Sequence, residues 1–215
     1  MDSYFTLQSN VEAMGEFVDR KSRFIAQLVH IESEDEANAF IEMVRKRHYD
    51  ARHNVPAWIL VDGRERQSDD GEPSRTSGMP TLEVLRGAGL KNVCCVVTRY
   101  FGGTLLGTGG LVRAYSRSVQ AGLAACCVLE KKKGFLLEME TDYSGIGKIQ
   151  YLLGQRGLLI TASQYTEKVT VETLVPEEEI VKVKEEITEG TNGKTVFAKE
   201  EPTAYAFDGK IPVFL

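Results

Sequence analysis

The sequence predicts an α+β fold in two domains. Strand-like and helix-like segments alternate along the first half of the 215-residue chain, and a second alternation begins after the lysine-rich segment at residues 131–134. Hydrophobic residues make up 42% of the chain and charged residues 27%, which is typical of a folded globular protein. A chain of this length forms one large domain or two ordinary ones. We expect the first domain over residues 1–133 and the second over residues 134–215.

The expected elements of the first domain alternate between strand and helix. Residues 23–31 have the length and β-branched content of a strand. In the helix expected next, Ser33 and Glu36 form a capping box. Apolar residues recur along one face of that helix, at Ala37, Phe40, Ile41 and Val44. The remaining elements are strands at residues 55–61 and 92–100 and helices at residues 81–90 and 111–123.

The second domain shows the βαββαβ order of a split βαβ, ferredoxin-like fold. Its expected strands cover residues 135–142, 158–168, 169–177 and 194–207, and its helices cover residues 143–157 and 178–193. Gly157 and Gly193 stand at the expected helix ends, where the left-handed conformation that closes a helix favours glycine.

The cysteines and the N-terminal segment favour a cytoplasmic protein. Cys94–Cys95 and Cys126–Cys127 are adjacent pairs, a spacing that fits neither zinc nor thioredoxin-like motifs. Neighbours on a strand point to opposite faces, so we expect buried packing rather than disulfide bonds. Residues 1–10 lack the basic and apolar regions of a secretory signal. No apolar run reaches the roughly 20 residues that a membrane helix needs, so no membrane association is expected.

Basic residues are concentrated in the first domain. Residues 1–134 contain 18 Lys and Arg against 17 Asp and Glu, whereas residues 135–215 contain 8 against 14. Residues 84–129 contain no acidic residue, and their basic residues are Arg86, Lys91, Arg99, Arg113 and Arg117. A local basic surface can bind a polyanion although the whole chain has a net charge of −5.

A glycine-rich segment lies between the strand that ends at residue 100 and the helix expected from residue 111. Five of the nine residues from Gly102 to Gly110 are glycine, which is costly because glycine loses much backbone entropy on folding. N–H groups at a helix start attract phosphate or carboxylate, so we predict a site for a nucleic-acid phosphate. Its expected residues are Arg99, Tyr100, Phe101, Gly102, Gly103, Gly107, Thr108, Gly109, Gly110, Arg113 and Arg117.

Each part of this site has an alternative interpretation. Arg113 and Arg117 could form a solvated helix face, and Tyr100 and Phe101 could complete the packing of the strand instead of stacking on a base. The segment is not a Walker A loop, because no Gly-Lys-Ser/Thr follows, and it does not spell the Rossmann fingerprint. No cofactor is therefore expected.

An acidic loop precedes the glycine-rich segment. Residues 63–80 show no periodicity, and loops of this length in compact domains are usually functional or disordered. Three carboxylates in this loop could bind Mg²⁺, but Asp-Gly segments more often form turns, so a structural role is favoured and no metal or catalytic residue is expected. The residues expected to brace the glycine-rich segment are Asp69, Asp70, Gly71, Glu72, Pro73 and His53.

Four segments resemble the IMPACT/YigZ family in its bacterial two-domain form. They are KSRFIA at residues 21–26, ARHN at 51–54, DDGEP at 69–73 and RYFGGTLLGTGGLVRAY at 99–115. The last segment is long and compositionally improbable, so the resemblance is specific, and it extends over the whole chain. Residues 74–78 read SRTSG where the family more often has SGTAG, which adds Arg75 to the expected anion site.

The resemblance implies both folds and a role. The first domain should resemble the second domain of a small-subunit ribosomal protein, and the second domain should resemble the ferredoxin-like last domain of an elongation factor. The family implies a role near translation, without an established reaction. We therefore expect a non-catalytic protein that binds RNA, the ribosome or a protein partner in translation. Two alternatives remain open: a Mg²⁺-dependent, nucleotide-binding phosphotransferase or phosphohydrolase, and an adaptor that binds a partner through its acidic second domain.

Overall fold

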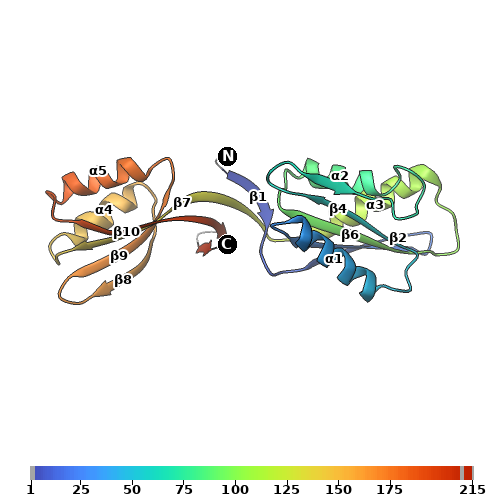
Figure 1. Ribbon diagram of the computed structural model, residues 1–215, viewed down its shortest axis with the longest axis horizontal. Coiled ribbons are helices and arrows are strands. Elements are labelled where there is room, and N and C mark those ends of the chain that lie inside the picture. Colours follow the sequence, from blue (N-terminus) through green and yellow to red (C-terminus); the bar gives the residue numbers. More distant parts are fainter. Residues whose placement is uncertain (1–2, 209–210, 215) are drawn as a thin grey trace. The chain divides into compact units, whose positions relative to one another are not determined.

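The computed structural model describes residues 3–208 and 211–214 and divides the chain into two compact units (Figure 1). The first, the N-terminal unit, comprises Tyr4–Glu130. The second, the C-terminal unit, is formed mainly by the residues from Lys131 onward. The division falls three residues before the expected boundary at 133/134.

The N-terminal unit is built on an antiparallel sheet with the strand order β2-β3-β6-β4-β5. The strands are β2 (Ala13–Asp19), β3 (Ser22–His30), β4 (His53–Ile59), β5 (Glu65–Gln67) and β6 (Val93–Tyr100). A further strand, β1 (Ser3–Leu7), pairs with β7 (Val128–Thr141). The central strands β3, β4 and β6 are almost wholly buried, because helices cover both faces of the sheet.

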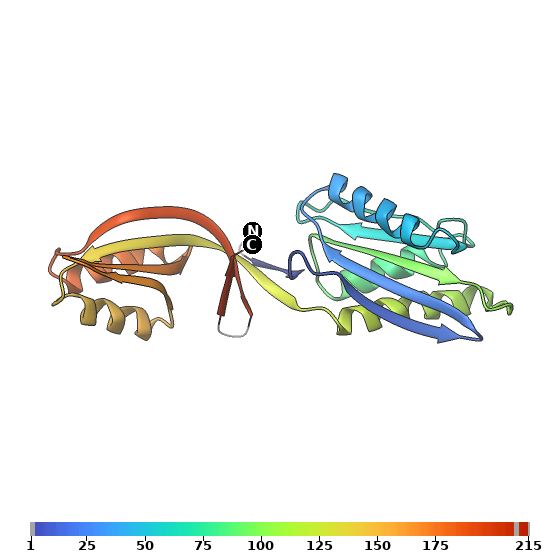
Figure 2. The same cartoon turned by 90° about the horizontal axis from the view of Figure 1, so that it is seen from below.

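Helix α1 (Glu34–Arg47) covers one face of this sheet, and α2 (Gly78–Gly87) and α3 (Gly107–Ala124) cover the other (Figure 2). Neighbouring residues of β6 therefore enter different cores. Cys94 packs in the core beneath α1, and Cys95 packs in the core beneath α2 and α3. This alternation confirms the expected packing of Cys94–Cys95, whereas Cys126 and Cys127 are only partly buried; all four thiols are free.

Helix α1 begins as its sequence predicts. The Ser33 hydroxyl accepts a hydrogen bond from the Glu36 N–H, as a capping box requires, whereas the Glu36 carboxylate accepts its bond from the Glu32 N–H, one residue before the cap. The four apolar residues at helical spacing, Ala37, Phe40, Ile41 and Val44, are all buried.

The C-terminal unit has the predicted βαββαβ order, with an added hairpin strand. Its elements are β7 (Val128–Thr141), α4 (Ile146–Gln155), β8 (Ile160–Tyr165), β9 (Val169–Pro176), α5 (Ile180–Gly190), β10 (Val196–Asp208) and β11 (Ile211–Phe214). The strand order β10-β7-β9-β8 is the one that a split βαβ arrangement requires. Residues of α4 and α5 share one core, for example Leu153 with Val183, so both helices cover the same face of the sheet.

Several expected boundaries are wrong. Helix α3 begins at Gly107 rather than at residue 111, so the second half of the glycine-rich segment is helical. Helix α2 begins at Gly78 rather than at residue 81. Strand β7 runs through the lysine-rich segment at 131–134, where the three lysine side chains are partly or fully exposed, so the strand can hold them without burying a charge.

Candidate functional site

A pocket of about 400 Å³ opens between the acidic loop and the start of α3. It brings together two segments that the sequence predicted to cooperate. Its lining comprises Arg52, His53, Gly71, Glu72, Pro73, Arg99, Phe101, Leu105, Leu106, Gly107, Thr108 and Leu111. Volumes of this size are typical of small-ligand sites.

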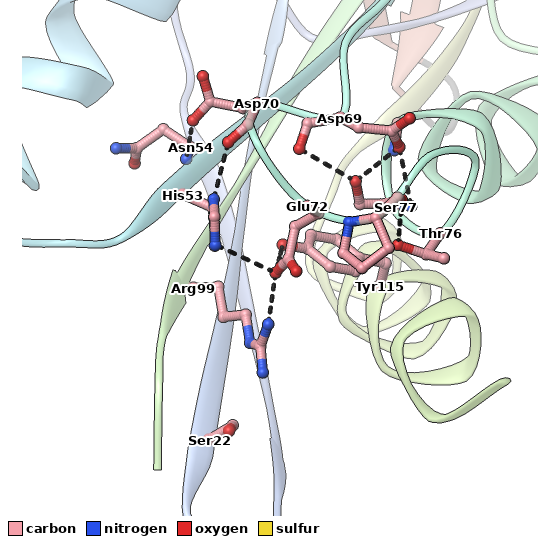
Figure 3. A network of polar contacts seen from close by, with 12 residues as sticks. Ser22, His53, Asn54, Asp69, Asp70, Glu72, Thr76, Ser77, Arg99 and Tyr115 are labelled. Atoms are coloured by element: carbon pink, nitrogen blue, oxygen red, sulfur yellow. Dashed lines mark hydrogen bonds and ion pairs between the residues drawn. The ribbon is translucent and has the colours of Figure 1, made fainter. Parts of the chain in front are cut away.

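A buried ion pair lies in the wall of this pocket. Arg99 Nη1 donates a hydrogen bond to Glu72 Oε1 over 2.6 Å, and the side chains are 7% and 3% exposed. The Tyr115 hydroxyl donates to the same oxygen over 2.9 Å. Burial and then the Glu72 charge raise the pKa of the Tyr115 hydroxyl, which keeps it a donor. Figure 3 shows Arg99, Tyr115 and His53 converging on the Glu72 carboxylate.

Arg99 retains unused hydrogen-bonding capacity. Its guanidinium lies 5.4 Å from the Phe24 ring centroid and 5.6 Å from that of Phe101, which holds its plane in place. Its Nε atom is buried and has no hydrogen-bond partner in the described part of the chain. A buried donor without an acceptor costs stability, so this N–H is a candidate contact for a bound acceptor.

His53 is held in one orientation. Its Nδ1 lies 2.7 Å from the Asp70 carbonyl oxygen, which can only accept, so Nδ1 carries the proton. Its Nε2 therefore faces Glu72 Oε1 at 3.9 Å. His53 and Arg99 are also direct neighbours across the β4–β6 ladder, and both lie on the α3 side of the sheet.

The acidic loop is ordered by its first carboxylate. Asp69 Oδ1 accepts hydrogen bonds from the N–H groups of Ser77 and Gly78, and Oδ2 accepts one from Arg75 N–H. Burial tends to raise the pKa of Asp69, but these bonds outweigh it and leave the pKa below its ordinary value. Asp70 accepts from the Asn54 N–H and from Arg45. These carboxylates brace their own loop and its attachment to β4.

Helix α3 begins without a capping side chain. Its N-cap residue is Leu106, and its first turn contains no acidic residue. The first N–H groups of a helix have no acceptor within the helix, so they remain available to an anion. Arg113 Nη1 lies 3.7 Å from the position a Cβ would take on Gly109, which places a guanidinium beside the positive end of the helix dipole. An anion would relieve this unfavourable arrangement.

The glycines have distinct roles. Gly103 and Gly107 have φ angles of +86° and +71°, which favour glycine. Gly102 N–H donates to Ser22 Oγ over 3.0 Å, and a Cβ on Gly102 would lie 2.1 Å from the Lys21 carbonyl carbon. The glycine-rich segment is thereby pressed against the β2–β3 turn, where Arg20 donates to the Leu105 carbonyl.

Several residues expected at the anion site lie elsewhere. Tyr100 follows Arg99 on the strand, so it lies on the α1 side, where its hydroxyl bonds Asp50 and His48. Arg117 lies over the Phe17 ring at 5.4 Å. Arg75 has an exposed side chain that does not line the pocket. Arg99 lines it, but its charge is balanced by Glu72. The lining also omits Gly102, Gly103, Gly109, Gly110, Arg113, Asp69 and Asp70.

The carboxylates of the acidic loop do not converge as a cation site would require. Asp69, Asp70 and Glu72 each accept hydrogen bonds from different protein donors. Among the described residues, no group of three His, Cys, Asp or Glu side chains is arranged to hold a metal ion.

Three important residues were absent from the expected site. Arg52 and Leu105 line the pocket, and Tyr115 bonds Glu72. Arg52 precedes His53 in the ARHN segment, and this position next to an expected site residue could have indicated that Arg52 also belongs to the site. Tyr115 is fully buried on the core side of α3, where its hydroxyl needs a partner.

No helix in the described ranges is long and apolar enough to span a membrane.

The sequence is similar to known protein families and to curated proteins. The family model of the Impact N-terminal domain matches residues 20–123, and a domain of unknown function, DUF1949, matches residues 139–194. Among curated proteins, IMPACT family member YvyE of Bacillus subtilis (strain 168) is 43% identical over 94% of both chains. IMPACT family member YigZ of Escherichia coli (strain K12) is 36% identical over 81% of this chain and 87% of its own.

One solved structure matches nearly the whole chain. A crystal structure described as that of a hypothetical protein covers 94% of this chain and 99% of its own, with 33% identity and a TM-score of 0.60. Yih1, described as a two-domain translational regulator, is a more distant match, with 28% identity over 56% of this chain and 49% of its own and a TM-score of 0.38. From the sequence matches over nearly its whole length, the chain belongs to the IMPACT family.

Proposed function

We propose that this chain is a cytoplasmic protein that binds single-stranded RNA, free or within the ribosome, and influences translation by binding rather than by catalysis. The observation that carries the proposal is the uncapped start of α3, which opens into the pocket beside Arg99. The expected likeness of the two units to a ribosomal-protein domain and an elongation-factor domain is part of this proposal.

The charge distribution around the pocket supports a polyanionic ligand. Arg52 lines the pocket, and Arg113 stands beside the first turn of α3. Neither makes an ion pair in the described part of the chain, so both charges are available to phosphates. Since the Glu72 charge is paired with Arg99, the nearest carboxylate does not cancel the charges of Arg52 and Arg113. Phosphate contacts of this kind give affinity without strong sequence preference.

A salt titration tests the proposal. Binding of a fluorescent single-stranded RNA should weaken steeply between about 50 and 200 mM salt, as expected for release of counterions. The double variant Arg52→Ala/Arg113→Ala should bind more weakly and with a shallower salt slope. The matched control is Arg64→Ala/Arg66→Ala, which removes two exposed arginines that have carboxylate partners and lie outside the pocket. RNA binding that is equal in both double variants would contradict the proposal.

A further inference from the structure

The lining of the pocket combines two chemistries. One is a set of unused N–H donors, and the other is exposed apolar surface. Both belong to the short stretch between the end of β6 and the first turn of α3. Donors and apolar surface together restrict the ligand to fewer chemical classes than positive charge alone would.

The donors fit a phosphate group with terminal oxygens. The N–H groups in the first turn of α3 have no capping side chain, and they open into the pocket at Gly107 and Thr108. Arg99 is only 6% exposed, and its Nε–H has no partner among the described residues. In Figure 3 its guanidinium extends away from the Glu72 carboxylate beyond the single bond they share. Arg52 adds a positive charge at the same pocket.

The apolar surface fits a nucleobase. Phe101 is 41% exposed and Leu105 is 81% exposed, and both line the pocket. The Phe101 ring already has the Arg99 guanidinium on it, so a base that stacks on Phe101 lies close to the donors. The Leu105 carbonyl oxygen accepts a hydrogen bond from Arg20, which ties the backbone at this residue to the β2–β3 turn.

The size of the pocket limits the ligand. A volume of about 400 Å³ lies near the lower end of the range for small-molecule sites, which suffices for one nucleotide but not for a base pair. The walls cannot widen easily, because Glu72, Arg99 and Tyr115 form a bonded, buried cluster and Gly102 is pressed against the β2–β3 turn.

We propose that this pocket binds one phosphorylated nucleotide, either a free nucleoside monophosphate or the phosphorylated end of an RNA strand. The phosphate binds the start of α3 together with Arg99 and Arg52, and the base packs on Phe101 and Leu105. This inference deepens the proposed RNA binding and rests on the same anion site, but it assigns a particular chemical group to it.

Binding measurements on the full chain distinguish the two sources. Calorimetric titrations use AMP, adenosine and inorganic phosphate, and anisotropy titrations use one short RNA with a 5′-phosphate, a 3′-phosphate or neither. AMP should bind at least about tenfold more tightly than adenosine or phosphate. If one of the phosphorylated RNAs binds about tenfold more tightly than the RNA without phosphate, the pocket takes the end of an RNA strand. If AMP binds but the three RNAs bind equally, the pocket takes the free nucleotide.

A variant that separates binding from folding completes the test. Thr108→Glu places a carboxylate in the first turn of α3, where it stabilises the helix dipole and occupies the position of the phosphate. AMP affinity should fall by about tenfold or more while the melting temperature stays equal or rises. Gln120→Glu, which adds the same charge to an exposed site near the end of the same helix, should leave AMP affinity unchanged.

The possible failures can be told apart. If inorganic phosphate binds as tightly as AMP, or if AMP does not bind, the nucleotide pocket is wrong. If RNA still binds with a steep salt slope in that case, the proposed function stands. If AMP binds and depends on Thr108 but no RNA binds, the pocket proposal stands and the RNA-binding function is wrong.

Discussion

Glu72 and Arg99 form an ion pair in which both side chains are more than nine-tenths buried, and they belong to segments that are 27 residues apart. Removing one charge from such a pair leaves the other buried without compensation, which usually destabilises a protein strongly. The pair therefore fixes the acidic loop to β6, and with it the wall of the pocket.

The variant Glu72→Ala should lower the free energy of unfolding by about 3–5 kcal/mol. Urea unfolding of the full chain, monitored by circular dichroism, measures the loss. Glu65→Ala is the matched control, because it removes the partner of Arg86 from a solvent-exposed ion pair, where the loss should be far smaller. Equal losses for the two variants would show that burial does not strengthen the Glu72 contact.

Gly102→Ala should disturb the pocket through its backbone. The added Cβ would lie 2.1 Å from the Lys21 carbonyl carbon, so the segment after β6 must move, at a cost of about 1–3 kcal/mol. Gly87→Ala is the control, since no atom lies within 4 Å of its Cβ position and helical alanine should be neutral or stabilising. Thermal melts of both variants measure the change in melting temperature. An unchanged melting temperature for Gly102→Ala would contradict the described contact.

Asp69 should make folding sensitive to acid. Its hydrogen bonds lower the folded-state pKa below the ordinary 3.8, so the unfolded chain binds this proton more readily. The contribution to stability is then complete above pH 3.8 and is lost as pH falls through the folded-state pKa. Asp69→Asn should be less stable at neutral pH and lose less stability on acidification. Urea unfolding at several pH values measures this, and parallel pH profiles for Asp69→Asn and the native chain would contradict it.

Ending the chain after Glu130 should leave RNA binding intact. The pocket lies within residues 52–111, and the N-terminal unit has its own two cores. A cooperative melt establishes that the shortened chain folds, and anisotropy then compares its affinity for RNA with that of the full chain. Loss of binding by a folded N-terminal unit would favour the adaptor interpretation, in which the acidic second domain makes the contact.

The sequence predicted elements whose local signals agree with one another. Helix α1 has both a capping box and an apolar stripe, and the C-terminal unit has six segments in an order that allows few arrangements. Strand β2 was missed because Met14 and Val18 are exposed apolar residues on its outer side, which hides the alternation of its inner residues. The start of α3 was placed too late because glycine opposes helix formation on average.

The candidate site was predictable as a set of segments but not as a set of contacts. Composition pointed to the glycine-rich segment and to the acidic loop, and both line the pocket. The pairing of Arg99 with Glu72 depends on which strands become neighbours, which local patterns do not encode. Period-two alternation could have separated Tyr100 from Arg99, since successive residues of a strand face opposite sides.

Because Cys94 and Cys95 pack on opposite faces of the sheet, their alkylation can report how the N-terminal unit opens. Burial raises the pKa of both thiols, so neither reacts with an alkylating reagent until its own side of the sheet is uncovered. Because each thiol lies beneath a different helical layer, their separate modification rates report whether α1 or the α2–α3 layer detaches first.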